Sequence, residues 1–501
     1  MRILLAPDSF MPRSVRSSAV FTLELARSLA SRHEVRVLWG EWDEALAPDA
    51  APTIAYGEYE GLRTVKITAP ASPYLLERLC LINYAATAAF AAYLEQFKPE
   101  VVHFQGIGPI SAGAVWAARR FGATTLLTVK DYWPICHKGG LVTYAGSDCA
   151  GPNGGLECAL QQCLLWSQEE YSALLAAENH LPRLPAEPQQ LEPPKLIPSP
   201  AKPTPGWYQL LRRVPTPVKN LVPGALRRAA RSKATFGSLE RPVEQSEEEE
   251  PLLPVDATPG LSSWRLDFLR ASFAQLHALT VTSPMVGEAL RHHGFNSPEP
   301  SLLLDGPGEY CPQECKPQQK AGSVTFGYLG AVLPDRRLSH LLQAFNRLPA
   351  NTHRLLIAGP GPKEYASLLR GLAAHPDICF MGQLAPGQLS TFLRALDVLV
   401  LPGNESLPLP TALSYARKCR LPVIAAASPD LCAAVKDGVD GLLYEPDDVA
   451  GLEQALNRLA SDTALRKTLG ANSPAVASAE EIAQRLEEEY RRRPAGERGD
   501  S

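Results

Sequence analysis

Apolar and polar positions alternate along the first 130 residues in a pattern typical of α/β proteins. Short apolar runs at 3–6 and 35–39 predict buried strands, and the segment between them repeats apolar residues at helical spacing. The alternation returns with a strand at 101–104, a helix at 112–120 and a strand at 124–129. Strands that alternate with amphipathic helices favour a parallel sheet, so we expect a doubly wound domain here.

A second unit of the same kind is predicted downstream. Apolar strands are expected at 324–329, 354–358, 378–381, 398–401 and 422–425, and amphipathic helices at 338–348, 363–374, 384–395 and 411–418. This repetition predicts a second Rossmann-like domain. A helical pattern at 479–492 predicts a terminal helix, followed by a polar tail.

The chain changes character between the two units. From about 165 to 260 it is rich in proline and carries an acidic run at 247–250, which predicts an insertion with much irregular structure. We therefore divide the chain into an N-terminal Rossmann-like domain (1–164), a Pro-rich and charged insertion (165–262), a return to the first domain with a linker (263–305), a C-terminal Rossmann-like domain (306–475) and a terminal helix with its tail (476–501).

Composition adds limits to this picture. Of the 501 residues, 45% are hydrophobic and 20% are charged, and the net charge is -4. The length exceeds what one hydrophobic core supports, and the weak negative charge argues against a nucleic-acid-binding protein. The apolar stretch at 75–94 contains Glu77, Arg78 and Asn83, so we expect no transmembrane helix. The first apolar run is too short for a signal peptide, so we expect a cytoplasmic protein.

One segment of the insertion is basic and amphipathic. Residues 207–236 combine leucines with arginines and lysines. Such a segment can lie on an anionic membrane surface, which would place the protein at the inner face of the membrane. The alternative is a solvated basic face that packs on the body of the protein.

Glycine-rich loops follow three predicted strands of the second unit. They are 327–330, 359–362 and 402–406, and Arg336 lies six residues past Gly330. Glycine allows a ligand to approach the backbone, and amide groups at a helix N-terminus suit a diphosphate. A glycine after a strand can also serve only as a tight turn. Because the carboxyl ends of parallel strands are where α/β sheets bind ligands, three such loops together favour a phosphate-binding site.

The same region carries an ordered series of motifs. They are Gly330 with a basic residue after Pro334-Asp335, the segments 357–362, 380–382 and 397–402, the tetrapeptide Glu405-Ser406-Leu407-Pro408, and the segments 422–425 and 437–443. Together they resemble the donor-binding domain of the family-4 retaining glycosyltransferases, a GT-B group that uses nucleotide sugars. The segments 98–104 and 131–136 of the N-terminal half are also similar to this family.

The resemblance implies a GT-B fold, with two Rossmann-like doubly wound α/β domains that face each other across a cleft. It implies transfer of a sugar from a nucleotide sugar to a glycan or glycoconjugate acceptor with retention of configuration, as in polysaccharide biosynthesis, and it requires no metal or other cofactor. Arg336 would contact the donor diphosphate, the backbone at Gly382 the base, and Glu405 the donor sugar.

The implied site residues fall into three sets. The donor-binding set is Gly330, Arg336, Gly359, Gly361, Gly382, Asn404, Glu405, Ser406 and Leu407. The catalytic set is Glu405, Lys130 and Asp131. The acceptor side, in the N-terminal domain, is Arg16, Ser17 and His103.

This sequence departs from the family pattern at four places. A second glutamate, usual eight positions after Glu405, is Leu413, which cannot accept a hydrogen bond from a ribose. A usual arginine is Ala331, a usual histidine is Lys130, and a usual Gly-Gly pair is Arg16-Ser17. Lys130 could hold phosphate or acceptor, or could be a salt-bridging lysine. The alternative function is therefore a catalytically weakened GT-B protein that acts as partner or scaffold of another glycosyltransferase.

Four cysteines lie close together in the N-terminal half. Cys136, Cys149, Cys158 and Cys163 could hold a structural zinc ion, but their gaps are not those of a zinc ribbon. The alternative is four free thiols that pack within a loop. We expect no metal in the catalytic site.

Overall fold

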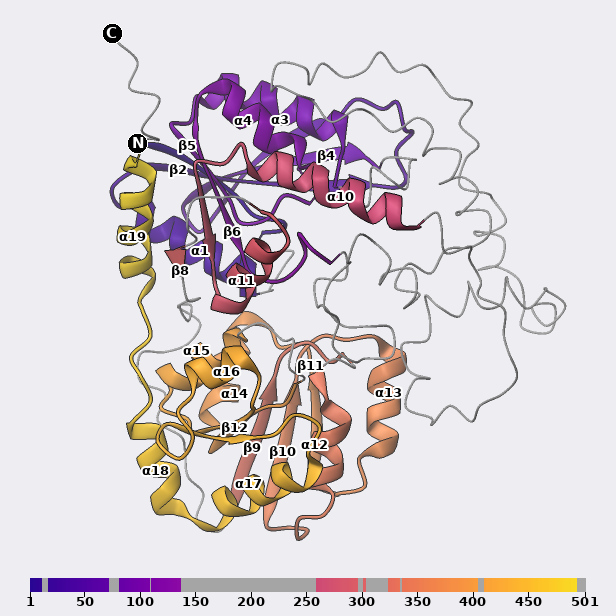
Figure 1. The fold of residues 1–501 in the computed structure, drawn as a ribbon, viewed down its shortest axis with the longest axis vertical. Helices are drawn as coiled ribbons and strands as arrows, with labels where there is room; N and C mark the ends of the chain where they lie inside the picture. The colour runs from indigo at the N-terminus through magenta and orange to yellow at the C-terminus, as the bar shows by residue number, and fades with distance from the viewer. Residues whose placement is uncertain are drawn as a thin grey trace, which may run out of the picture.

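The structure is a computed structural model that describes residues 1–10, 17–71, 81–108, 110–136, 258–295, 301–302, 323–333, 336–403 and 410–492. The expected insertion at 165–262, including the basic segment 207–236, lies outside the described residues up to residue 257. Figure 1 shows two α/β domains, one above the other, with the chain's last helix alongside the upper domain.

The N-terminal domain is built on one sheet with the strand order β3-β4-β2-β1-β5-β6-β7-β8. The strands are β1 (Arg2–Ala6), β2 (Glu34–Asp43), β3 (Thr53–Tyr59), β4 (Leu62–Pro70), β5 (Val101–Phe104), β6 (Thr124–Val129), β7 (Ala278–Val281) and β8 (Ser301–Leu302). All neighbours are parallel except β3 and β4, which form an antiparallel hairpin through Glu60 and Gly61. Both turn residues have positive φ angles, of 50° and 79°, a conformation that glycine adopts without strain.

Helices cover both faces of this sheet. They are α1 (Ser17–Ala30), α3 (Tyr84–Phe97), α4 (Gly113–Phe121), α10 (Thr258–Phe273) and α11 (Pro284–His292). Successive strand residues point to opposite faces. Ile3 and Leu5 therefore pack in the core beneath α1, whereas Leu4 and Ala6 pack in the core beneath α3 and α4. Burial on both faces explains why these strands are continuous apolar runs.

The C-terminal domain has a six-stranded, wholly parallel sheet with the order β11-β10-β9-β12-β13-β14. Its strands are β9 (Val324–Leu329), β10 (His353–Ala358), β11 (Ile378–Gly382), β12 (Val398–Leu401), β13 (Val423–Ala426) and β14 (Gly441–Tyr444). Its helices are α12 (Leu338–Phe345), α13 (Lys363–Leu372), the 3-10 turn η4 (Pro386–Gln388), α14 (Leu389–Arg394), α15 (Thr411–Lys418), α16 (Pro429–Ala434), α17 (Val449–Ser461) and α18 (Thr463–Ala471).

The last helix, α19 (Ala479–Arg491), returns to the N-terminal domain (Figure 1). Its apolar face, formed by Ile482, Leu486 and Tyr490, is buried in the same core as α1. A capping box fixes its start, because Ser478 and Glu481 satisfy each other's backbone amides. The terminal helix thus completes a core that begins with the first strand of the chain.

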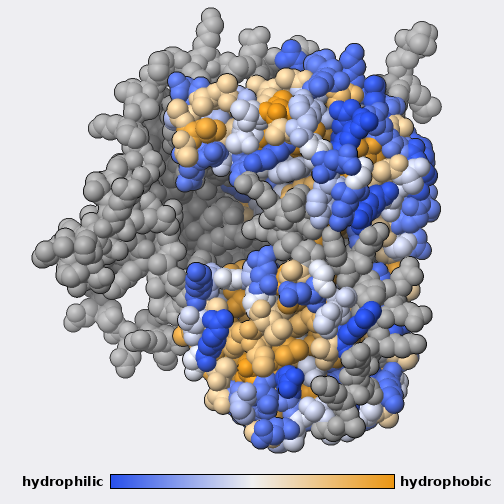
Figure 2. All heavy atoms as spheres, turned by 180° about the vertical axis from the view of Figure 1, so that it is seen from behind, coloured by the Kyte–Doolittle hydropathy of each residue, from blue (hydrophilic) through white to orange (hydrophobic). Residues whose placement is uncertain are grey.

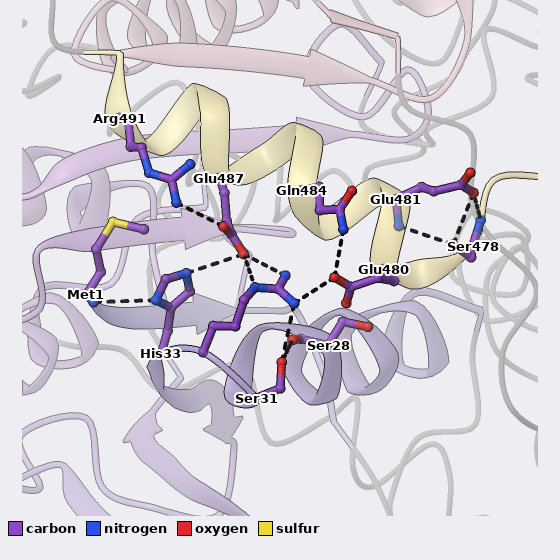
Figure 3. Close-up of polar contacts among 11 residues, drawn as sticks. Met1, Ser28, Ser31, His33, Ser478, Glu480, Glu481, Gln484, Glu487 and Arg491 are labelled. Atoms are coloured by element: carbon purple, nitrogen blue, oxygen red, sulfur yellow. Dashed lines mark hydrogen bonds and ion pairs between the residues drawn. The ribbon is translucent and has the colours of Figure 1, made fainter.

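A carboxylate of α19 ties this helix to the N-terminal domain (Figure 3). Glu487 accepts hydrogen bonds from Arg32 at 2.9 and 2.7 Å and lies 3.3 Å from the Nε2 atom of His33. Arg491 donates to its other oxygen at 3.0 Å. Nearby charges outweigh burial, so the pKa of Glu487 lies below its ordinary value.

Several expected elements differ from those in the structure. The hairpin β3–β4 was not predicted, because β3 is an edge strand whose side chains are mostly exposed and therefore do not alternate. The helix expected at 384–395 is divided into η4 and α14, where Pro386 and Gly387 interrupt the pattern. The apolar stretch at 75–94 contributes to α3, and within the part of the chain that the structure describes no helix has the length and hydropathy needed to span a bilayer.

Candidate functional site

The carboxyl ends of the two sheets face each other, and an aspartate of the C-terminal domain joins them. Ser283 follows β7 in the N-terminal domain, and Asp430 follows β13 in the C-terminal domain. The hydroxyl of Ser283 donates to Oδ2 of Asp430, and the backbone amide of Met285 donates to Oδ1 at 3.3 Å. Seen from behind, the surface is recessed between the two domains (Figure 2). The strand-end loops of both domains therefore border one space.

Each sheet has a topological switch point at this boundary. In the N-terminal domain the strand order reverses between β1 and β5, and in the C-terminal domain it reverses between β9 and β12. Ligands of open α/β sheets bind outside the carboxyl ends of strands at such points. Asp8 and Gly106 flank the first point, and Gly330 and Gly403 flank the second.

Lys130 and Asp131 directly follow β6 in the N-terminal domain. The ammonium group of Lys130 lies 4.2 Å from the centroid of the Phe21 ring on α1, which is a cation–π distance. The backbone amide of Trp133 donates to Asp131 at 2.8 Å. Burial raises the pKa of Asp131 above its ordinary value, and this amide and the positive charges of Arg336 and Lys130 oppose the rise.

The charge of Arg336 therefore acts on Asp131 from the opposite domain. Arg336 lies in the turn before α12, where its amide donates to the carbonyl of Leu333 at 3.1 Å. The next residue, Arg337, instead forms an ion pair with Asp447 within its own domain, at 2.7 Å. Lys130 and Arg336 thus both carry positive charges that act on Asp131, and their joint role in one site stays a prediction.

The glycine loops of the C-terminal domain lie side by side. The amide of Gly330 donates to Ala358 at 3.0 Å, the amide of Val332 to Pro360 at 2.7 Å, and the amide of Gly359 to Gly382 at 2.8 Å. The carboxyl ends of β9, β10 and β11 are therefore joined backbone to backbone.

Gly359 and Gly361 are required by this packing. Gly359 has a φ of 146°, and a Cβ atom there would lie 1.7 Å from the carbonyl oxygen of Gly330. A Cβ atom on Gly361 would lie 2.3 Å from the carbonyl oxygen of Val332. Contact of these glycines with a donor stays a prediction.

Two protein-family models match this chain. The model described as "Glycosyl transferase 4-like domain" matches residues 18–156, and the model described as "Glycosyl transferases group 1" matches residues 323–462. Together they cover more than half of the chain and fall on its two domains. This chain belongs to the group 1 glycosyltransferase family.

Curated relatives of this glycosyltransferase are similar over shorter stretches. A D-inositol 3-phosphate glycosyltransferase of Actinosynnema mirum is 36% identical over 165 residues, which is 30% of this chain and 39% of the relative. An exopolysaccharide phosphotransferase, SCO2592, of Streptomyces coelicolor is 30% identical over 168 residues, which is 32% of this chain and 17% of the relative. The matched part thus spans less than half of these relatives' own length.

Solved structures resemble this glycosyltransferase over nearly the whole chain. Sucrose-phosphate synthase from Thermosynechococcus elongatus has a TM-score of 0.54 at 16% identity, covering 98% of this chain and 96% of that one. The catalytic domain of starch synthase IV from Arabidopsis thaliana has a TM-score of 0.56 at 12% identity, covering 97% and 98%. Anabaena Alr3699/HepE has a TM-score of 0.53 at 12% identity, covering 96% and 94%. The fold is the GT-B fold, as the sequence predicted.

His103 of this glycosyltransferase does not lie on an exposed acceptor surface. It is fully buried, with Nδ1 at 2.7 Å from the hydroxyl of Tyr490 on α19 and Nε2 at 2.8 Å from the hydroxyl of Thr128. Burial, together with the charge of Lys130, lowers the pKa of His103 to about 3. The expectation that His103 meets an acceptor does not fit this placement; its partner Tyr490 is 387 residues away in sequence, so no local pattern indicated the contact.

Leu413 of this glycosyltransferase lies in α15 and is only 1% exposed, within the core beneath α14 and α15. Its side chain presents no surface to a ribose.

Several other predicted site residues lie outside the described residues: Arg16, Asn404, Glu405, Ser406 and Leu407. Ser17 is the first residue of α1, and its side chain is not described. Gly382 is the last residue of β11; it is exposed, and its φ angle is positive, at 67°.

The cysteine cluster is described only in part. Cys136 is buried and free, and Cys149, Cys158 and Cys163 lie outside the described residues. In the ranges that the structure describes, no three histidine, cysteine, aspartate or glutamate side chains are grouped as metal ligands would be. The zinc site and the packed free thiols both stay predictions.

Asp8 of this glycosyltransferase was missed by the sequence analysis. It follows β1 at the switch point, and its Oδ1 atom accepts the amide of Gly108 at 3.1 Å. A Cβ atom on Gly106 would lie 2.1 Å from this carboxylate, so the absence of a side chain at Gly106 makes room for Asp8. The available signal was an acidic residue after the first strand together with a glycine after the neighbouring strand.

Proposed function

We propose that this protein transfers a sugar from a nucleotide-sugar donor to a hydroxyl of a glycan or glycoconjugate acceptor, with retention of the anomeric configuration. The observation that carries the proposal is that positive charges from both domains, on Lys130 and Arg336, act on the buried Asp131 at the facing carboxyl ends of two sheets. A diphosphate needs fixed positive charge, and an acceptor hydroxyl needs a nearby hydrogen-bond acceptor.

On the donor side, Arg336 would stabilise the leaving diphosphate. The amides of Gly330, Val332 and Gly359 already donate to neighbouring loops, so they are not free to bind phosphate oxygens. The guanidinium then carries a larger share of the charge stabilisation than in a site with open amides. Glu405 would position the donor sugar, as the family resemblance implies.

On the acceptor side, Asp131 would hold the reacting hydroxyl while Lys130 adds positive charge near the leaving group. The bond between the anomeric carbon and the diphosphate oxygen breaks, and the acceptor oxygen bonds to the same face of that carbon. The acceptor proton passes to the departing phosphate oxygen or to Asp131, whose pKa is raised by burial.

Structural neighbours indicate which donors to test first. The HepE structures are described as complexes with UDP, with UDP and glucose, and with UDP-glucose, and the starch synthase structure holds ADP and acarbose. These ligands belong to those proteins. They support a first panel of UDP, ADP and their glucose conjugates.

Calorimetric titration with this panel tests the proposal. At least one nucleotide should bind, and Arg336→Ala should weaken diphosphate binding by about 1.5–3 kcal/mol, because a charge-assisted contact is lost. Arg337→Ala is the matched control, since it removes an equal charge from the adjacent residue, which is paired with Asp447. Absence of binding by every nucleotide would contradict an enzyme and favour the partner or scaffold alternative.

Product analysis tests the chemical outcome. Proton NMR of the glycoside formed by the nucleotide sugar that binds should show the donor's anomeric configuration. An inverted product would refute retention while leaving sugar transfer in place.

Membrane contact by the segment 207–236 is tested separately. Equal pelleting with anionic vesicles by the full chain and by a variant lacking that segment would refute it.

A further inference from the structure

The contact between Asp430 and the start of α11 is a buried junction between the two domains. Ser283 is fully buried and Asp430 is 2% exposed. Ser283 also accepts the amide of Val286 at 3.2 Å as the N-cap of α11. A single carboxylate of the C-terminal domain therefore bonds to two groups at one corner of the N-terminal domain.

Both sides of this junction are capped helix N-termini. Asp430 lies in the first turn of α16, whose N-cap Ser428 is fully buried and accepts the amide of Leu431 at 3.4 Å. A carboxylate is stabilised near the positive end of a helix, and Asp430 is near the N-termini of two helices, α16 and α11. Because charge is costly to bury, this carboxylate favours the arrangement in which both sets of donors reach it.

The same corner supports the end of β6. Thr282, the residue before Ser283, donates its amide to the carbonyl of Val129 at 3.2 Å and its hydroxyl to the carbonyl of Lys130 at 3.4 Å. The turn at 282–285 thus touches Asp430 on one side and Lys130 on the other. Movement of Asp430 away from Ser283 would release the corner that holds Lys130 and Asp131 opposite Arg336.

We propose that Asp430 is an interdomain positioning residue, which holds the β6 end with Lys130 and Asp131 against the donor-binding domain through Ser283 and Met285. This inference rests on the proposed function for its catalytic consequence. Asp430 itself is not placed against the reacting atoms.

Asp430→Ala and Ser283→Ala in the full chain test the junction without any ligand. Asp462→Ala is the matched control, because Asp462 is also a helix-capping aspartate, accepting the amide of Leu465 at 2.8 Å, but it lies wholly within the C-terminal domain. The readouts are hydrogen exchange at the amides of 285–287 and the radius of gyration from small-angle X-ray scattering.

Asp430→Ala should speed exchange at 285–287 by at least tenfold and increase the radius of gyration, although the substitution lies in the other domain. Asp462→Ala should do neither. Unchanged exchange at 285–287 together with an unchanged radius of gyration in Asp430→Ala would overturn the proposal. Asp430→Asn, which keeps one acceptor oxygen, should give an intermediate exchange rate, and it provides a second readout if Asp430→Ala does not fold.

Kinetic measurements distinguish a failure of the positioning role of Asp430 from a failure of the proposed function. If the protein transfers sugar, Asp430→Ala should lower kcat by at least tenfold while the affinity for the nucleoside diphosphate changes less than threefold, because Arg336 stays in its own domain. A tenfold loss of diphosphate affinity with kcat unchanged would overturn the positioning role. If no nucleotide binds the unmodified protein, the proposed function fails, and the exchange and scattering results still decide whether the junction exists.

Discussion

The two facing edges of the molecule are built in opposite ways. The N-terminal edge presents charged side chains, Asp8, Lys130 and Asp131, at the ends of β1 and β6. The C-terminal edge presents glycine-containing loops whose backbones are hydrogen-bonded to one another, and the charge of Arg336 acts across the boundary. The N-terminal edge therefore contributes charged side chains, and the C-terminal edge contributes a backbone that is held by hydrogen bonds.

The edges also differ in what supports them. The glycine edge is held by neighbouring loops within about 50 residues of sequence, from Gly330 to Gly382. Support for the charged edge includes distant partners, since His103 beneath it bonds to Tyr490 of α19. Changes at the glycine edge should thus act locally, whereas changes at the far end of the chain should reach the charged edge.

Alanine substitution of one glycine at each edge should give the largest difference in stability between the two edges. Gly359→Ala should destabilise the C-terminal domain by about 3–5 kcal/mol, because the new Cβ atom collides with a backbone oxygen at a φ that only glycine adopts easily. Gly106→Ala collides with the Asp8 side chain, which can rotate away, so its cost should be about 1 kcal/mol. Urea unfolding measures both, and equal losses would contradict the contrast between backbone and side-chain edges.

Loss of one hydroxyl on α19 should weaken the charged edge from a distance. Tyr490→Phe leaves a ring nitrogen of buried His103 without its partner, so the N-terminal domain should lose about 1–3 kcal/mol. Tyr444→Phe in the C-terminal domain is the control, with an expected change below about 0.5 kcal/mol. Thermal unfolding compares them, and a larger loss for Tyr444→Phe would refute the dependence on α19.

Acid should destabilise the N-terminal domain through His103. Its pKa is about 3 when folded, against about 6.5 when unfolded, so the unfolded chain binds a proton first as the pH falls below 6.5. Stability should therefore fall by about 2 kcal/mol between pH 7.5 and pH 5. His103→Gln should remove this part of the pH dependence, as urea midpoints at the two pH values would show. If the stability of His103→Gln falls between pH 7.5 and pH 5 as much as that of the unmodified protein, other groups cause the pH dependence.

The smallest expected effect concerns Asp131. Its pKa is raised by burial, so its contribution to stability is present below the unfolded pKa and is lost as the pH rises through the folded pKa. Asp131→Asn should therefore gain slightly in stability at pH 7, by less than about 1 kcal/mol, while sugar transfer falls. Paired melting and activity measurements check this, and a loss of stability at pH 7 would show that the carboxylate holds the edge together.

Local patterns in the sequence were sufficient to predict most of the parallel strands in the two sheets. β5, β6, β9, β12 and α15 have the predicted bounds, because each is a short apolar run or an amphipathic repeat between turn residues. The edge strand β3 of the hairpin was missed, because its mostly exposed side chains carry no period. The role of α19 was missed for a different reason, since periodicity shows that a helix has an apolar face but not which domain covers that face.

The candidate site was predicted from the order of the motifs. Motif order proposed Lys130, Asp131 and Arg336; the charges of Lys130 and Arg336 act on Asp131, and the roles of all three in a site stay predictions. It could not show that Gly359 serves loop packing, or that His103 is buried, because both depend on partners from other strands or from the chain's far end. Asp430 was not predicted as a site residue, because an aspartate in a helix's first turn is an ordinary capping feature.

The return of α19 to the first domain also sets an order for synthesis on the ribosome. Residues 323–471 contain every described element of the second sheet and its helices, so this domain can acquire its core as soon as that segment has emerged. The α1 side of the first domain lacks Ile482, Leu486 and Tyr490 until residues 482–490 have been translated, after the whole second domain. The domain made first is therefore the one completed last, and its uncovered apolar surface is the part of the nascent chain that chaperones would need to shield.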